Sequence, residues 1–149
     1  FPIIAKYLNT APFSGEYYFN ATSTTVYFQL LKDGPLSRIT TSGAGVLDLN
    51  TWYHCCATYS GSGIDTGLNT YLNGDALVQT RTSNAYTSMI LYPTSNCLIG
   101  GTLISEATYY NMANGSISNA MIYNRNLSDT EIKKLYQTPY AMFEENHIG

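Results

Sequence analysis

Short runs rich in Tyr, Thr and Val recur along the chain, and each run ends at a turn signal. The stretch from Glu16 to Leu31 contains two such runs joined by a small polar segment, which predicts a hairpin or meander. Lys32-Asp33-Gly34-Pro35 is a turn signal, and a strand is predicted after it over 38–41. Closely spaced short strands with turn residues between them predict an all-β domain.

Asn73-Gly74 is the most specific of these turn signals. Asn-Gly is the favoured dipeptide of a type I′ turn, so a hairpin is predicted between strands at 68–72 and 75–80. Further strands are predicted over 51–59, 96–100 and 116–123. The strand over 51–59 would place one set of residues on the core face, Tyr53, Cys55, Ala57 and Tyr59, and the alternate set on the opposite face, Trp52, His54, Cys56 and Thr58.

One helix interrupts the β pattern near the end of the chain. Ser128 is placed as its N-cap with Glu131 three residues later, which is the pattern of a capping box. Ile132, Leu135 and Tyr136 follow at helical spacing, and Pro139 ends the helix. The predicted fold is therefore a two-sheet antiparallel β-sandwich with one short C-terminal helix.

Composition narrows the classes of function. With 149 residues, one domain is expected. Seven basic and ten acidic residues leave a net charge of -3, which does not match the basic surface that nucleic acid requires. No apolar run approaches the ~18 residues of a membrane span. The 18 Thr, 13 Ser and 13 Asn exceed all charged residues together, a neutral-polar surface often found in extracellular binding modules.

Several segments, in order, carry a resemblance to a known family. They are Asn50-Thr51-Trp52-Tyr53-His54, Ala57-Thr58-Tyr59-Ser60-Gly61, Thr70-Tyr71-Leu72-Asn73-Gly74, Leu98-Ile99-Gly100, Asn114-Gly115-Ser116-Ile117 and the run from Met121 to Ile132, continuing to Leu135-Tyr136. Together they resemble the laminin-G-like jelly roll of the concanavalin-A-like lectin/glucanase superfamily over about residues 46 to 136. The tail Pro139-Tyr140-Ala141-Met142-Phe143 also looks like domains on phage and marine microbial surface proteins.

The resemblance implies opening strands that are not found ahead of Pro2-Ile3-Ile4-Ala5-Lys6. We therefore expect residues 1–149 to be a single, N-terminally incomplete module of a larger protein. Alternatively, strands of another copy or another chain complete the sheets, because an uncovered apolar edge invites such pairing. A homo-oligomer joined through exposed sheet edges is the form that this alternative would take.

The resemblance also raises calcium as a cofactor, since many relatives bind it with carboxylates at the rim of the sandwich. Where many relatives carry Ile-Asp-Glu, this chain has Ile117-Ser118-Asn119. Calcium needs six to eight oxygen ligands, usually with several carboxylates, so the shared site is not expected. Asp48, Asp65 and Asp75 lie in or near predicted turns and are weak candidates for a different site.

Catalysis is not expected from these residues. Glycoside hydrolysis needs two opposed carboxylates, and the Glu-x-Asp-x-x-Glu run of the superfamily's hydrolases is absent from the sequence. Glu144 and Glu145 are adjacent in the tail, and His54 and His147 lack the context of a nucleophile elbow. The chain has three cysteines, Cys55, Cys56 and Cys97, so at most one internal disulfide can form. We favour small, buried, free cysteines over a disulfide.

Loop tyrosines and amides are the candidate ligand-binding residues. Sugars stack on aromatic rings while amides and carboxylates bond their hydroxyls. The candidates are Glu106, Tyr109, Tyr110 and Asn111 in one connection, with Tyr86 and Tyr92 in another. The resemblance, more than these residues, implies carbohydrate binding, and we expect a non-catalytic carbohydrate-binding or adhesion module of a secreted, cell-surface or virion protein. The alternative is a structural, assembly or protein-binding module without sugar affinity.

Overall fold

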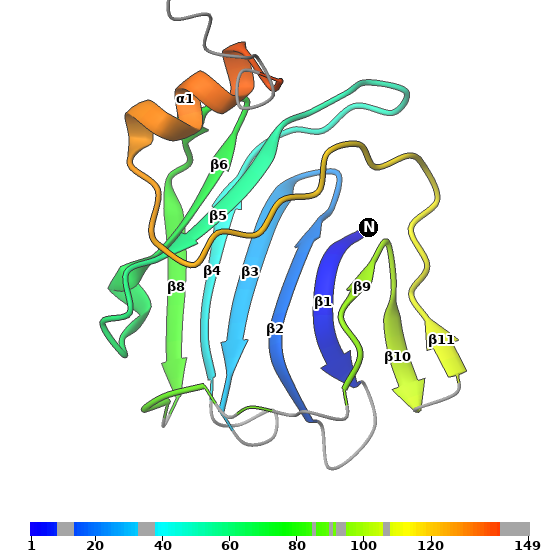
Figure 1. The fold of residues 1–149 in the computed structure, drawn as a ribbon, viewed down its shortest axis with the longest axis vertical. Coiled ribbons are helices and arrows are strands. Elements are labelled where there is room, and N and C mark those ends of the chain that lie inside the picture. The colour runs from blue at the N-terminus through cyan, green and yellow to red at the C-terminus, as the bar shows by residue number, and fades with distance from the viewer. Residues whose placement is uncertain are drawn as a thin grey trace, which may run out of the picture.

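The computed structural model describes residues 1–8, 14–32, 38–84, 86–89, 91, 95–105 and 108–140. Within them, two β-sheets and one α-helix are arranged as Figure 1 shows, with the three-stranded sheet in front of one half of the eight-stranded sheet. The predicted all-β class, with antiparallel sheets and a single short helix, is confirmed.

The large sheet forms the body of the molecule. Its strands, in spatial order, are β11 (Thr108–Tyr110), β10 (Thr102–Ser105), β1 (Pro2–Leu8), β2 (Ser14–Ala21), β3 (Thr25–Leu31), β4 (Arg38–Ala44) and β8 (Gln79–Asn84), and β9 (Leu98–Ile99) also pairs with β1. Every pair is antiparallel except β1 with β10. The hairpin expected between Glu16 and Leu31 is the β2–β3 pair.

The small sheet contains β5 (Cys55–Tyr59), β6 (Leu68–Leu72) and β7 (Asp75–Ala76), with a 3₁₀ turn, η1, at Asp65–Gly67. Asn73 and Gly74 have φ angles of 53° and 81°, the two positive values that a type I′ turn requires. The predicted returning strand over 75–80 is divided: its first part pairs with β6, and the chain then crosses to the large sheet, where β8 pairs with β4.

The core lies between the two sheets, where β6 packs on β3 and β4. Leu30, Ile39, Leu68 and Tyr86 form one buried cluster there, and full burial of such a side chain contributes about 1.5–3 kcal/mol. We call the side of the large sheet that faces β6 its inner face, and the opposite side its outer face.

The small sheet is covered on its other side by the helix α1 (Asp129–Gln137). Tyr71 of β6, Leu127 and Ile132 form the second buried cluster, against which Cys56 also packs. The two faces of β5 therefore both pack: Tyr59 contacts the inter-sheet cluster, as expected for the core face, and Cys56 contacts the cluster under the helix.

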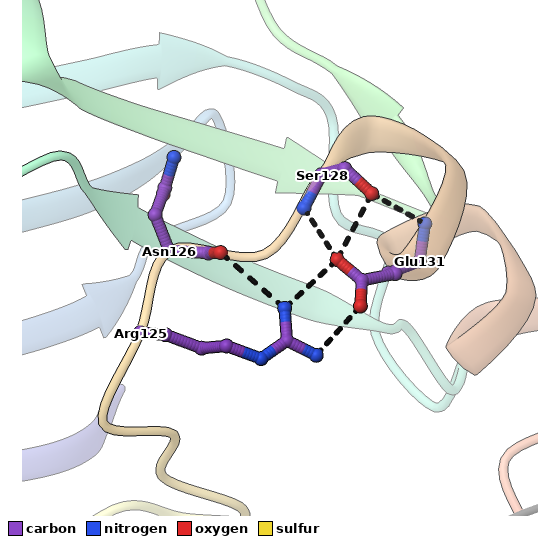
Figure 2. Close-up of polar contacts among 4 residues, drawn as sticks. All are labelled: Arg125, Asn126, Ser128 and Glu131. Carbon is purple, nitrogen blue, oxygen red and sulfur yellow. Dashed lines mark hydrogen bonds and ion pairs between the residues drawn. The ribbon is translucent and has the colours of Figure 1, made fainter.

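The start of α1 has the predicted capping box (Figure 2). The Ser128 hydroxyl accepts from the Glu131 backbone N–H at 3.3 Å, and the Glu131 carboxylate accepts from the Ser128 backbone N–H at 2.9 Å. Arg125 forms a bidentate ion pair with the same carboxylate: Nη1 donates to Oε2 at 3.0 Å and Nη2 donates to Oε1 at 2.6 Å. These bonds satisfy backbone donors that the first turn of a helix leaves unpaired.

The strand predicted over 116–123 is wrong. The chain between β11 and α1, yellow to orange in Figure 1, joins neither sheet. Asn119 has a φ of 50°, a left-handed conformation that interrupts an extended run at its centre. Most side chains of this segment are exposed, so alternation in the sequence does not correspond to a buried face here.

No helix among the described residues is long and apolar enough to cross a membrane.

Candidate functional site

Three tyrosines project from the outer face of the large sheet. In the ladder, Tyr18 of β2 stands opposite Ala5 of β1 and Gln29 of β3, and Tyr27 of β3 stands opposite Asn20 of β2. Residues opposite each other in a ladder share a face, and neighbours along a strand alternate. The intervening Phe19, Phe28 and Leu30 therefore point to the inner face.

The rings of these tyrosines form a continuous row, which we call the tyrosine row (Tyr7, Tyr18 and Tyr27). Tyr7 and Tyr18 are stacked, with ring centroids 5.5 Å apart and an interplanar angle of 27°. Tyr18 and Tyr27 meet edge to face, at 6.2 Å and 62°. Both arrangements are favoured for aromatic pairs, so the row is held in place across three strands.

Amide side chains fix the hydroxyl groups of the row. Tyr27 Oη donates to Gln29 Oε1 at 2.6 Å, and Asn20 Nδ2 donates to Tyr18 Oη at 3.1 Å. Gln29 is only 5% exposed, so this amide forms part of the floor beneath the rings. Asn20 Oδ1 is also buried, and it has no hydrogen-bond partner among the described residues.

A depression of about 330 Å³ opens over this row, a volume within the range typical of small-ligand sites, about 300–1,000 Å³. The described residues of its lining combine the three rings with amides and hydroxyls, and none of them is a carboxylate: they are Tyr7, Tyr18, Asn20, Thr22, Thr25, Tyr27, Gln29, Thr102 and Asn111. The site therefore offers flat apolar surfaces next to neutral hydrogen-bonding groups.

Burial controls the protonation of the row. Partial removal from water raises the pKa of Tyr7, Tyr18 and Tyr27 above the usual value of a phenol. The positive charge of Arg38 lowers the pKa of Tyr7 and Tyr27 and so partly offsets this effect. All three phenols stay neutral at physiological pH and can act as both donors and acceptors.

The residues predicted from the sequence occupy different places. Asn111 lines the depression. Tyr109 and Tyr110 lie on the edge strand β11, where they are 64% and 42% exposed. Tyr86 is 8% exposed and belongs to the inter-sheet core, whereas Tyr92 and Glu106 lie outside the described residues.

The sequence reasoning missed the tyrosine row and its amides, although a signal for them exists. Tyr18 and Asn20 alternate with apolar residues along β2, and Tyr27 and Gln29 do the same along β3. An aromatic next to an amide on the polar face of two paired strands indicates a binding face. The pattern lies in paired strands, whereas the residues predicted from the sequence lie in predicted connections between strands.

The three aspartates considered for a metal do not meet. Asp48 lies in the loop after β4, where its carboxylate is 3.5 Å from Tyr53 Oη; Asp65 begins η1, and Asp75 begins β7 and pairs with Lys133 at 2.6 Å. Across the described part of the chain, no three His, Cys, Asp or Glu residues gather closely enough to hold a metal ion.

The remaining candidates for catalysis are the three cysteines and His54. All three cysteines are free thiols, and burial raises the pKa of Cys55 and of Cys56 to about 11. Burial lowers the pKa of His54, whose ring lies 6.0 Å from that of Tyr136. Cys97 is exposed and accepts a hydrogen bond from Tyr17 Oη at 3.3 Å. Neither of the half-buried thiols, Cys55 and Cys56, is activated for nucleophilic attack.

Comparison with known proteins places the chain in a family. The model of the family described as Concanavalin A-like lectin/glucanases superfamily matches residues 4–133. No curated protein matches the chain. A crystal structure of residues 221–444 of an S-layer domain-containing protein from Clostridium thermocellum is similar, with 27% sequence identity and a TM-score of 0.46. The similarity covers 80% of this chain, which spans about half (55%) of that structure.

Proposed function

The chain belongs to the Concanavalin A-like lectin/glucanases superfamily, and on that premise we propose that it is a non-catalytic carbohydrate-binding module of an extracellular or surface protein. The observation that carries this proposal is the tyrosine row under an open depression, supported by Asn20 and Gln29. The sugar would lie across β1, β2 and β3 on the outer face of the large sheet.

The apolar faces and the hydroxyl groups of a saccharide match the aromatic rings and the amides of the depression. The C–H faces of a pyranose ring are apolar and stack on aromatic rings, while its hydroxyls need donors and acceptors. The stacked pair Tyr7 and Tyr18 supplies the aromatic surface, and the amides at the floor supply the donors and acceptors. Because the rings are already held by each other, little side-chain freedom is lost on binding.

Asn20 supports the proposal most directly. A buried acceptor without a partner costs about 1–3 kcal/mol, and such groups in folded proteins need an explanation. Asn20 Oδ1 is buried, unpartnered among the described residues, and part of the lining of the depression. A hydroxyl of a bound sugar would donate to this oxygen and remove the penalty.

A non-catalytic role is supported by the same lining. Glycoside hydrolysis needs a pair of carboxylates about 5–10 Å apart across the bond that breaks. The described residues that line the depression provide phenols, amides and hydroxyls. These groups bind a sugar without the acid and the base or nucleophile that cleavage requires.

The proposal is tested by a glycan array with the purified protein and two single variants. Tyr18→Ala removes the central ring of the row, and Tyr109→Ala removes an exposed ring of β11 outside the depression. We expect saturable binding to a defined class of saccharide that is lost in Tyr18→Ala and kept in Tyr109→Ala. Absence of binding by folded wild-type protein, or equal loss in both variants, would contradict the proposal.

A structural or assembly role is the second candidate, and the edges of the sheets favour it. β11 ends one side of the large sheet and carries Tyr109 and Tyr110 exposed to solvent, and β5 ends one side of the three-stranded sheet. Exposed edges with apolar side chains pair readily with other strands, so a second copy would complete the sheets here. Light scattering that shows only monomers at high protein concentration would rule out this self-association.

A further inference from the structure

Arg38 is the first residue of β4, and it shares the outer face with the tyrosine row. In the ladder it stands opposite Leu31 of β3, which alternates along its strand with the inner-face residue Leu30. Ile39, the next residue along β4, is fully buried in the inter-sheet cluster. Arg38 therefore points away from the core and toward the side of the sheet where the depression lies.

The guanidinium of Arg38 has an unused donor. Its Nε atom is buried and has no hydrogen-bond partner in the described part of the chain. The ion pairs found among these residues join Lys6 to Glu16, Arg125 to Glu131 and Lys133 to Asp75, so none of them involves Arg38. A buried donor on a charged group is more costly to leave unpaired than a neutral one.

The positive charge of Arg38 influences two tyrosines of the row. It lowers the pKa of Tyr7 and Tyr27, which both line the depression. The chain as a whole has a net charge of -3, so the positive charge of Arg38 on this face is opposite in sign to the net charge of the protein.

We propose that the saccharide held on the tyrosine row is acidic, and that its anionic group, a carboxylate or a sulfate ester, pairs with the guanidinium of Arg38. This inference rests on the proposed carbohydrate binding and specifies its ligand class. Guanidinium groups bind carboxylate and sulfate oxygens through two parallel N–H donors. A sugar ring on Tyr7 and Tyr18 would place its anionic substituent on the same face of the sheet as Arg38, which stands opposite Leu31, two residues after Gln29 of the lining.

The inference is tested with matched pairs of acidic and neutral saccharides. Homogalacturonan and alginate oligosaccharides are compared with their methyl esters, and a sulfated galactan oligosaccharide is compared with its desulfated form. Titration calorimetry of the full chain at low and at high salt gives the affinities. We expect one acidic probe at least to bind about tenfold or more tightly than its neutral counterpart, and we expect salt to reduce this preference.

Two variants assign the preference to Arg38. Arg38→Gln should reduce the affinity for the acidic probe to that of its neutral counterpart and leave the neutral affinity unchanged, which also shows that the variant is folded. Lys134→Gln removes one positive charge from the exposed side of α1 and should leave the preference intact. The carboxylate and sulfate arms then show which anionic group is bound.

Each outcome separates this inference from the proposed function. If the wild-type protein binds neutral saccharides as tightly as acidic ones, the assignment of an acidic ligand is overturned and carbohydrate binding stands. If Arg38→Gln keeps the preference for the acidic probe, the role of Arg38 is overturned. If no saccharide of either kind binds to folded protein, both the inference and the proposed function fail.

Discussion

Asn20 donates a hydrogen bond from its side-chain nitrogen to the Tyr18 hydroxyl at 3.1 Å, while its own side-chain oxygen is buried without a partner in the described chain. The amide is therefore only half satisfied in the free protein. Such an arrangement holds a ring in position and leaves an unsatisfied acceptor on a residue that lines the depression.

The variant Asn20→Leu distinguishes the contribution of Asn20 to stability from its contribution to saccharide binding. Loss of the bond to Tyr18 costs about 0.5–1.5 kcal/mol, and removal of a buried unpaired oxygen returns about 1–3 kcal/mol. We therefore expect the free energy of unfolding to lie between about 0.5 kcal/mol below and about 2.5 kcal/mol above the wild-type value, while saccharide affinity falls about tenfold. Urea unfolding and calorimetric titration measure the two quantities, and a large loss of stability with unchanged affinity would show that Asn20 is structural.

Glu131 makes the stability of the helix cap depend on pH. Arg125 and the Ser128 donors hold the pKa of its carboxyl at about 2, below the usual 4.5. Its contribution is therefore present above pH 4.5 and is lost as the pH falls toward 2. We expect the difference in melting temperature between wild type and Glu131→Gln to be constant above about pH 5 and to shrink toward pH 2. A difference that does not change with pH would contradict the ion pair.

Ser128 provides a control for the same cap. Its hydroxyl accepts the Glu131 backbone N–H, and replacing such an N-cap by Ala costs about 0.5–2 kcal/mol. Ser128→Ala should lower the free energy of unfolding by about 1 kcal/mol at neutral pH. Circular dichroism in urea measures this loss, and saccharide binding on the distant tyrosine row should not change.

At Gly43, β4 packs closely against Thr70 of β6 and against Leu77. A Cβ atom at this position would lie 2.5 Å from Thr70 Oγ1 and 2.5 Å from Leu77 Cβ. Because Gln79 binds Thr70 and Leu77 at the same place, the neighbours are fixed. We expect Gly43→Ala to destabilise the fold by about 1–3 kcal/mol. Ala44→Ser, at the exposed neighbouring position, serves as the control, and equal stability of the two variants would contradict this packing.

The cysteines should differ in reactivity. Cys97 is exposed, whereas burial raises the pKa of Cys55 and of Cys56 to about 11. A thiol with that pKa is about one part in a thousand thiolate at pH 8. A thiol reagent should therefore label Cys97 rapidly in the native protein and all three cysteines after unfolding. Fewer than three thiols in the unfolded protein would reveal a disulfide.

Local patterns predicted the local structure well. The capping box at Ser128 and Glu131 and the turn at Asn73 and Gly74 are confirmed, because each depends on bonds or backbone angles within a few residues. The strand over 116–123 is wrong, since its alternation had no partner strand to satisfy its backbone. Whether a run of alternating residues becomes a strand depends on neighbours that are distant in the sequence.

The candidate site shows the same limit. Tyr7, Tyr18 and Tyr27 come from three strands, and the register of β1 with β2 and of β2 with β3 brings them together. The sequence shows that Tyr18 and Tyr27 alternate with apolar residues, but it does not show which strands lie side by side. Sequence reasoning therefore favoured Tyr109 and Tyr110, which are neighbours in the chain, and it identified only Asn111 of the residues that line the depression.

The position of the bound saccharide is the most direct test of carbohydrate binding on the outer face. Tyrosine ring resonances, assigned by single Tyr→Phe substitutions, can be followed by NMR while the saccharide found on the array is added. We predict shifts for Tyr7, Tyr18 and Tyr27, and none for Tyr109 on β11, which stands opposite Leu103 outside the lining of the depression. Shifts confined to Tyr109 and Tyr110, with the tyrosine row unchanged at saturation, would contradict it.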